Sequence, residues 1–148
     1  MHIARLPAAA VLAAALLAVP AADAAVSAGA YKGKTDQNRA VTFKVKKGKV
    51  VAFQAGVMTF CNTMGANRFQ TDAVANVPDM KVKGNGRFKW SGDTEDDGTI
   101  EVSGRITGSK AKGKVTLSRP DSNYDASEGV FRFGSCAAND RAWTAKLR

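Results

Sequence analysis

The chain has 148 residues and a formal net charge of +9, with 22 Lys and Arg against 13 Asp and Glu. Its only histidine, His2, lies in an Ala- and Leu-rich segment that ends near residue 24. The remaining 124 residues keep the net charge of +9, because that segment contains one Arg and one Asp. Without histidine they cannot form a Ser-His-Asp triad, a Cys-His pair or a histidine-ligated metal site. We therefore expect a protein that is not an enzyme and needs no cofactor.

The first 24 residues have the parts of a secretory signal peptide. Arg5 provides the positive start, residues 6–19 are mostly apolar, and residues 22–24 give a small-x-small cleavage pattern. The apolar run is shorter than the roughly 20 residues that a membrane-spanning helix needs. We expect cleavage before Ala25, no transmembrane anchor, and a secreted or periplasmic protein made of residues 25–148.

The rest of the chain alternates apolar and polar residues over short segments that glycine turns separate. Val41, Phe43 and Val45 alternate with polar neighbours, and a turn at Gly48 leads into an apolar run at residues 50–57. Because side chains two apart lie on one face of a strand, this period indicates half-buried strands. It predicts one all-β antiparallel domain of about eight to ten short strands, arranged as a sandwich or a closed meander barrel. The same period of two recurs at residues 87–91, 99–107, 113–117, 131–133 and 143–147.

Two segments lack this pattern. Within residues 62–80, the part 62–67 resembles a loop, and 69–77 fits a strand or a short helix. The polar stretch Ser118–Glu128 predicts an exposed loop.

Large aromatic side chains lie on the apolar faces of the expected strands. A domain of this size needs most of its large side chains to fill a core. In a closed barrel they could instead surround a small apolar ligand. The residues concerned are Tyr31, Phe43, Phe53, Phe88, Trp90, Phe131, Phe133 and Trp143.

Cys61 and Cys136 are the only two cysteines. An even number in an exported chain favours a disulfide over free thiols, and the absence of a C-x-x-C motif argues against redox activity. Such a bridge would close a loop of about 75 residues, which the chain-entropy model values at roughly 4–5 kcal/mol.

An acidic turn at residues 93–98 resembles the start of a calcium loop. Asp93, Glu95 and Asp97 occupy the first, third and fifth positions, and Gly98 the sixth. The twelfth position is Gly104 instead of a bidentate Glu, and the flanking segments resemble strands. The pattern favours a hairpin tip, with a weak calcium site at the three carboxylates as the alternative.

Basic residues recur at a spacing of two, which places them on one face of each strand. Several such strands could present a positive surface to an anionic partner, such as a cell-wall polymer or lipopolysaccharide. Exposed lysines also serve solubility and protect edge strands from aggregation. Specific nucleic-acid binding is not expected, because no aromatic platform is interleaved with these residues. The possible anionic-partner face comprises Lys44, Lys46, Lys81, Lys83, Arg87, Lys89, Lys110, Lys112 and Lys114.

A set of strand and turn positions carries a resemblance: Gly29-x-Tyr31-x-Gly33-x-Thr35, Val41-x-Phe43-x-Val45, Cys61, Gly104-Arg105-Ile106, Gly113, Cys136 and Trp143-Thr144-Ala145. Together these positions resemble small secreted bacterial single-domain β proteins of uncharacterised function. The resemblance spans nearly all of residues 25–148 and implies an exported β domain. It implies no activity and no site residues.

The sequence therefore predicts a secreted, monomeric, non-catalytic binding or cell-surface-associated β domain. Its basic face would contact an anionic envelope polymer. The alternative is a carrier whose barrel interior holds a small apolar ligand.

Overall fold

A computed structural model describes residues 25–63, 69–95, 97–125 and 127–148. The expected signal peptide, residues 1–24, lies outside the described residues. In the described part of the chain, no helix is long and apolar enough to cross a membrane. The strands are β1 (Gly29–Thr35), β2 (Ala40–Lys46), β3 (Lys49–Thr63), β4 (Phe69–Val77), β5 (Met80–Lys81), β6 (Arg87–Asp93), β7 (Thr99–Thr107), β8 (Lys110–Asp125) and β9 (Val130–Leu147).

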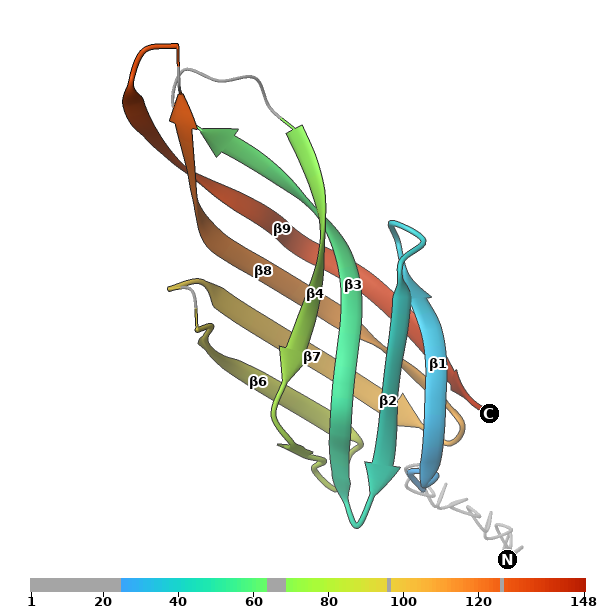
Figure 1. Ribbon diagram of the computed structural model, residues 1–148. Coiled ribbons are helices and arrows are strands. Elements are labelled where there is room, and N and C mark those ends of the chain that lie inside the picture. Colours follow the sequence, from blue (N-terminus) through green and yellow to red (C-terminus); the bar gives the residue numbers. More distant parts are fainter. Residues whose placement is uncertain (1–24, 64–68, 96, 126) are drawn as a thin grey trace, which may run out of the picture.

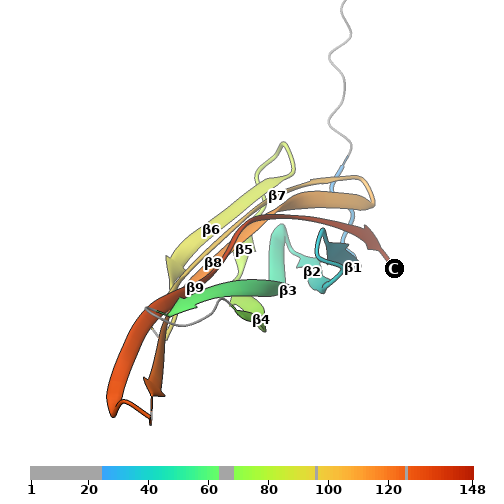
Figure 2. The same ribbon diagram turned by 90° about the horizontal axis from the view of Figure 1, so that it is seen from above.

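All of these strands belong to one antiparallel sheet, so the predicted all-β antiparallel fold is confirmed. The strand order is β4-β3-β2-β1-β9-β8-β7-β6, and the short β5 pairs with β3. The sheet bends so that β3 and β4 face the layer made by β6, β7, β8 and β9 (Figure 2). Strands β4 and β6 are the two ends of the order. The fold is thus a single sheet bent into two facing layers.

Strands β3 and β9 form a fork that positions the first hairpin. At one end they pair directly, from Phe60 with Ala137 to Thr63 with Gly134. Further along they separate, and the β1–β2 hairpin lies between them (Figure 1). In that region β2 pairs with β3 and β1 pairs with β9. One long strand can therefore bond to two different neighbours along the same edge.

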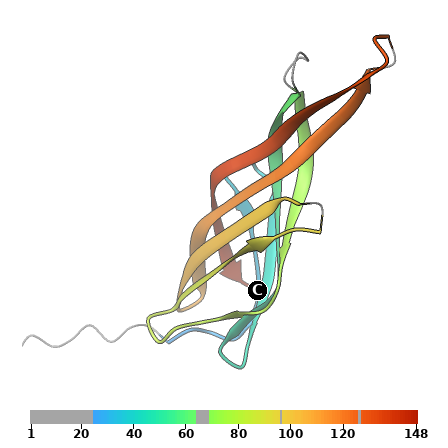
Figure 3. The same ribbon diagram turned by 90° about the vertical axis from the view of Figure 1, so that its left-hand side faces the viewer.

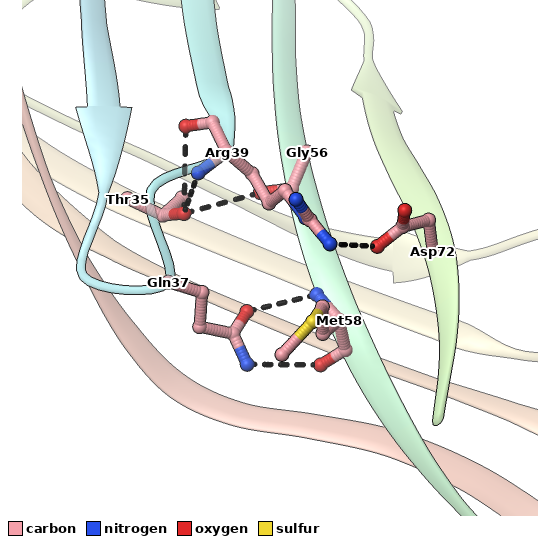
Figure 4. Close-up of polar contacts among 6 residues, drawn as sticks. All are labelled: Thr35, Gln37, Arg39, Gly56, Met58 and Asp72. Carbon is pink, nitrogen blue, oxygen red and sulfur yellow. Dashed lines mark hydrogen bonds and ion pairs between the residues drawn. The ribbon is translucent and has the colours of Figure 1, made fainter. Parts of the chain in front are cut away.

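Residues 56–59 of β3 lie between these two pairings, and side chains of the β1–β2 turn bond to their backbone (Figure 4). The side-chain Nε2 of Gln37 donates to the Met58 carbonyl at 3.0 Å, and the Met58 N–H donates to the side-chain Oε1 of Gln37 at 2.8 Å. The Thr35 hydroxyl donates to the Gly56 carbonyl at 3.4 Å. On the other side of the fork, the Asp36 N–H donates to the Ala142 carbonyl at 2.8 Å. The turn therefore satisfies backbone groups that the fork leaves without a strand partner.

Aromatic side chains fill the space between the layers. The Tyr31 and Phe43 rings stack at 4.8 Å between centroids, and Phe43 and Phe53 stack at 5.7 Å. The Trp143 ring packs against the rings of Phe43, Phe53 and Phe88, with centroid distances of at most 6.1 Å. All five rings are at most 3 % exposed. The predicted core role of these side chains is confirmed.

Two of the aromatic residues expected in the core differ from that expectation. Trp90 is only partly buried, although it packs against the core, and Phe133 is 66 % exposed. Beyond the last β3–β9 pair, strands β8 and β9 continue as an arm (Figure 3), and Phe133 lies opposite Ser122 in this arm. The side chain of Phe131 lies outside the described residues.

The prediction of an exposed loop at Ser118–Glu128 was wrong for residues 118–125 and is confirmed only for residues 127 and 128, which lie in an exposed turn. Strand β8 runs to Asp125 and pairs with β9 as far as Val130. Beyond Ser118 the described β7 no longer pairs with β8, and past Gly134 the described β3 no longer pairs with β9. From the Ser122–Phe133 pair outward, the arm is therefore a two-stranded hairpin. Such a hairpin lacks the half-buried surroundings that produce a clear apolar–polar alternation. In the other weakly patterned segment, Phe69–Val77 is strand β4, while 64–68 lies outside the described residues.

Candidate anion-binding site

A surface groove lies across β1, β9, β8 and β7. Seven basic residues line it, together with Thr107 and Thr144 and a few small or apolar residues. No Asp or Glu is among the described residues that line it. We call this feature the basic groove and define it by Lys32, Lys34, Arg105, Lys110, Lys112, Lys146 and Arg148.

Strand alternation directs these side chains outward. On β1 the side chains of Tyr31 and Thr35 are buried, so Lys32 and Lys34 face solvent. On β9 the buried residues Trp143 and Ala145 leave Lys146 on the outer face. The same aromatic core that holds the layers together therefore fixes the orientation of the basic residues.

Strand register brings the basic residues into two rows that cross the sheet. The first row runs from Lys32 to Lys146, Lys110 and Thr107, each directly opposite the next. The second row runs from Lys34 to Thr144, Lys112, Arg105 and Arg87 in the same manner.

Like charges lie directly opposite one another in both rows. Like charges in directly opposed positions destabilise a sheet. We expect an effect of the same size as that of favourable cross-strand pairs, which each contribute roughly 0.2–1 kcal/mol. Two groove side chains have neutral partners. Lys34 Nζ donates to Asn38 Oδ1 at 2.6 Å, and Arg105 Nε donates to the Asn85 carbonyl at 3.1 Å. Both of these partners are neutral, so these two contacts do not reduce the positive charge of the groove.

Two carboxylates lie beside the next row of the sheet. Asp36 Oδ2 accepts a hydrogen bond from the Ala142 N–H at 3.4 Å, at the end of β1. Ala142 lies opposite Lys114, and Lys114 Nζ is 3.6 Å from Asp140 Oδ1. The two carboxylates therefore bound the groove on this side.

The structure divides the nine basic residues singled out in the sequence into three groups. Lys110 and Lys112 line the groove, while Arg87, Lys89 and Lys114 flank it on β6 and β8. The remaining four residues lie away from the groove: Lys44, Lys46, Lys81 and Lys83. Of these, Lys46 and Lys81 lie on either side of Lys49, where β2, β3 and β5 pair.

Five groove residues were not recognised from the sequence. Lys32 with Lys34, and Lys146 with Arg148, show the same spacing of two that identified the other lysines. That signal would have found them. Arg105 is a single basic residue on its strand, and only the register with Lys112 places it in the groove.

The acidic turn closes the β6–β7 hairpin. The Thr94 N–H donates to the Gly98 carbonyl, and the Gly98 N–H donates to the Thr94 hydroxyl, both at 2.8 Å. Asp97 adopts a left-handed φ of 57°, as a tight turn requires. Asp93, Glu95 and Asp97 are all exposed. Calcium binding by these carboxylates stays a prediction.

Cys61 and Cys136 form a disulfide between residues directly opposite each other on β3 and β9. Among the described residues, the one group of three potential metal ligands within 4.8 Å of one another consists of these cysteines and Asp121. Both sulfurs are in the disulfide, so neither is available as a thiolate ligand. The bridge closes the fork at the end opposite the basic groove.

A second depression lies beside β4 and the β6–β7 hairpin. It combines the carboxylates of Asp72, Asp93 and Glu95 with Arg119 and the partly buried Trp90. Asp72 already pairs with Arg39 at 2.8 Å (Figure 4). Its mixed charge contrasts with the single sign of charge in the basic groove.

Comparison with known proteins identifies no relative: no family model matches the sequence, and no curated protein or solved structure matches it significantly.

Proposed function

We propose that this protein is a secreted, non-catalytic binding domain that holds an anionic envelope polymer in the basic groove. The observation that carries the proposal is the lining of the groove, where the described residues include seven basic side chains and no Asp or Glu. The signal-peptide pattern at the start of the chain supports export. A disulfide fits an oxidising compartment outside the cytosol.

Rigid presentation makes these charges suitable for binding. The basic residues project from paired strands that a buried aromatic core holds in place. An anion that settles between opposed cations relieves their mutual repulsion, so its binding is favoured by more than its own contacts. A surface of one sign also speeds encounter with an oppositely charged polymer.

The alternative, a carrier of apolar ligands, has less support. The side chains of Tyr31, Phe43, Phe53, Phe88 and Trp143 occupy the space between the layers. An apolar ligand would have to displace these packed rings.

The proposal can be tested by sedimentation of the protein with purified bacterial cell wall at about 0.1 M and about 1 M salt, where charges are screened over roughly 10 Å and 3 Å. We expect retention at the lower salt and release at the higher salt. The double variant Lys112→Glu/Lys146→Glu should lose retention. Lys46→Glu/Lys81→Glu makes the same change of charge outside the groove and should remain bound. The proposal would be overturned if the retained fraction were the same at both salt concentrations, or if both variants lost retention equally.

A further inference from the structure

We infer that the basic groove takes a linear chain of phosphate groups that crosses the strands. The inference rests on the proposed function and specifies its ligand. Two sources share this chemistry, a polyol-phosphate polymer of the envelope and inorganic polyphosphate. The geometry of the two rows carries the argument.

The length of the second row points to a polymer instead of a single anion. Its five residues lie on β1, β9, β8, β7 and β6, and four of them are basic. Neighbouring strands lie roughly 4.8 Å apart, so the row spans roughly 19 Å. A single phosphate can contact only a small part of such a row. A chain of phosphates can pair with several cations at once.

The spacing between the rows allows contact from both sides. Residues two apart on a strand are separated by roughly 6.7 Å. Lys32, Lys110 and Lys146 in the first row therefore face the same strip of surface as Lys34 and Lys112 in the second. Long lysine side chains from both rows can reach a chain that lies between them.

The flanking carboxylates set the direction of the chain. A ligand that ran along β8 from Lys110 and Lys112 would next meet Lys114, which lies 3.6 Å from Asp140. On β1 it would meet Asp36, two residues beyond Lys34. Both routes lead an anion toward negative charge. The path across the strands meets no Asp or Glu among the described lining residues.

The chemistry of the lining favours phosphate over other repeating groups. Arg105 offers a planar fork of donors that matches phosphate geometry, and Thr107 and Thr144 add hydroxyl donors. Except where Thr144 separates Lys34 from Lys112, neighbouring cations lie roughly 5–7 Å apart along and between the rows. Widely spaced carboxylates on a polysaccharide would leave many of these cations unpaired. No aromatic residue is among the described groove residues, so the bases of a nucleic acid would have no stacking platform.

Isothermal titration calorimetry can test this inference with orthophosphate, triphosphate, polyphosphate longer than the second row and a polyglycerol phosphate chain. Oligo-dT and a carboxylated polysaccharide are the comparison ligands. We expect affinity to rise with chain length, to on the order of 100-fold tighter for the long phosphate chains than for orthophosphate. Whichever long chain binds more tightly identifies the source, and equal binding supports the shared chemistry.

Variants of two basic residues of the second row test the path. Lys34→Gln/Arg105→Gln should weaken the long chains much more than it weakens orthophosphate. Lys46→Gln/Lys81→Gln, outside the groove, should leave all affinities unchanged, and circular dichroism should show both variants folded. Affinity that is independent of chain length, or oligo-dT or the carboxylated polysaccharide binding as tightly as the phosphate chains, would overturn the inference alone. Absence of binding to every anion would overturn the proposed function as well.

Discussion

Gly104 and Gly113 lie opposite each other on β7 and β8, directly against the indole of Trp143. A Cβ atom at Gly104 would lie 2.6 Å from the Phe88 ring and 2.7 Å from the Trp143 ring. Both distances are well inside van der Waals contact, and both rings are buried. The absence of side chains on β7 and β8 is therefore what allows the large indole to enter the core.

Gly104→Ala should consequently destabilise the protein by about 1–3 kcal/mol, the usual effect of overpacking a core. Urea denaturation measures this change in the free energy of unfolding. The matched control is Gly84→Ala, because a Cβ there would meet nothing within 4 Å. Equal stability of the two variants would show that the indole can shift to make room.

The Tyr31 hydroxyl makes the free energy of unfolding depend on pH in the alkaline range. This hydroxyl donates to the carbonyls of Ser27 and Gly108 at 2.8 and 3.1 Å. Burial raises the pKa of this hydroxyl above its ordinary value of 10.0. As the pH increases, the unfolded chain therefore loses this proton before the folded protein does. The associated stability is complete below pH 10 and is lost as the pH rises through the folded pKa.

We therefore expect the free energy of unfolding to decrease more steeply above pH 10 in the wild type than in Tyr31→Phe. Denaturation across a series of alkaline buffers gives both slopes. The comparison uses slopes because Tyr31→Phe also removes two hydrogen bonds at every pH. Parallel curves would mean that the hydroxyl does not contribute to the alkaline transition.

At the scale of elements, the fork depends on the Gln37 side chain, which makes the backbone hydrogen bonds that a neighbouring strand would otherwise make. Gln37 both donates to and accepts from the Met58 backbone. Gln37→Ala would leave both of these part-buried groups without their partner, at a cost of about 1–3 kcal/mol. Gln54→Ala, at an exposed position of the same strand β3, is the control and should be near neutral. Hydrogen exchange should also show faster exchange at the Met58 amide, and an unchanged rate would contradict this role.

The disulfide secures the other end of the fork. It joins directly opposed residues that are 75 positions apart in sequence. The chain-entropy model predicts a loss of roughly 4–5 kcal/mol at most when such a bridge is removed. Denaturation with and without reductant measures the loss, and Cys61→Ala/Cys136→Ala should show no response to reductant. If reduction left the wild-type stability unchanged, the remaining β3–β9 pairing would be sufficient on its own.

The contrast between predicted and observed elements has a physical cause. Periodicity identified half-buried strands such as β2 and β7, because one face of each contacts the aromatic core. It failed for the end of β8, which lies in an arm with no facing layer to impose alternation. Spacing placed lysines on strand faces, but it could not show that Lys112 lies opposite Arg105. Cross-strand register is a property of the folded sheet, so the groove could not be assembled from the sequence.

On the scale of the whole molecule, the fold keeps opposed like charges on one outer surface and a disulfide at the far end. The like-charged cross-strand pairs of the groove destabilise the unliganded sheet. We therefore expect that the groove binds anions at the expense of the stability of the free protein. Lys49 and Lys81 form a similar like-charged pair outside the groove. This second pair allows the cost of repulsion to be measured separately from binding.

The most direct test is thermal unfolding at low salt, with and without polyphosphate, of the wild type and two charge-reversal variants. Without ligand, Lys112→Glu/Lys146→Glu and Lys46→Glu/Lys81→Glu should both be more stable than the wild type, because each replaces like-charge pairs with opposite-charge pairs. At a ligand concentration about 100 times Kd, the wild type and Lys46→Glu/Lys81→Glu should gain about 2.7 kcal/mol. Lys112→Glu/Lys146→Glu should gain almost nothing. Equal stabilisation of all three proteins by polyphosphate would contradict the assignment of binding to the basic groove.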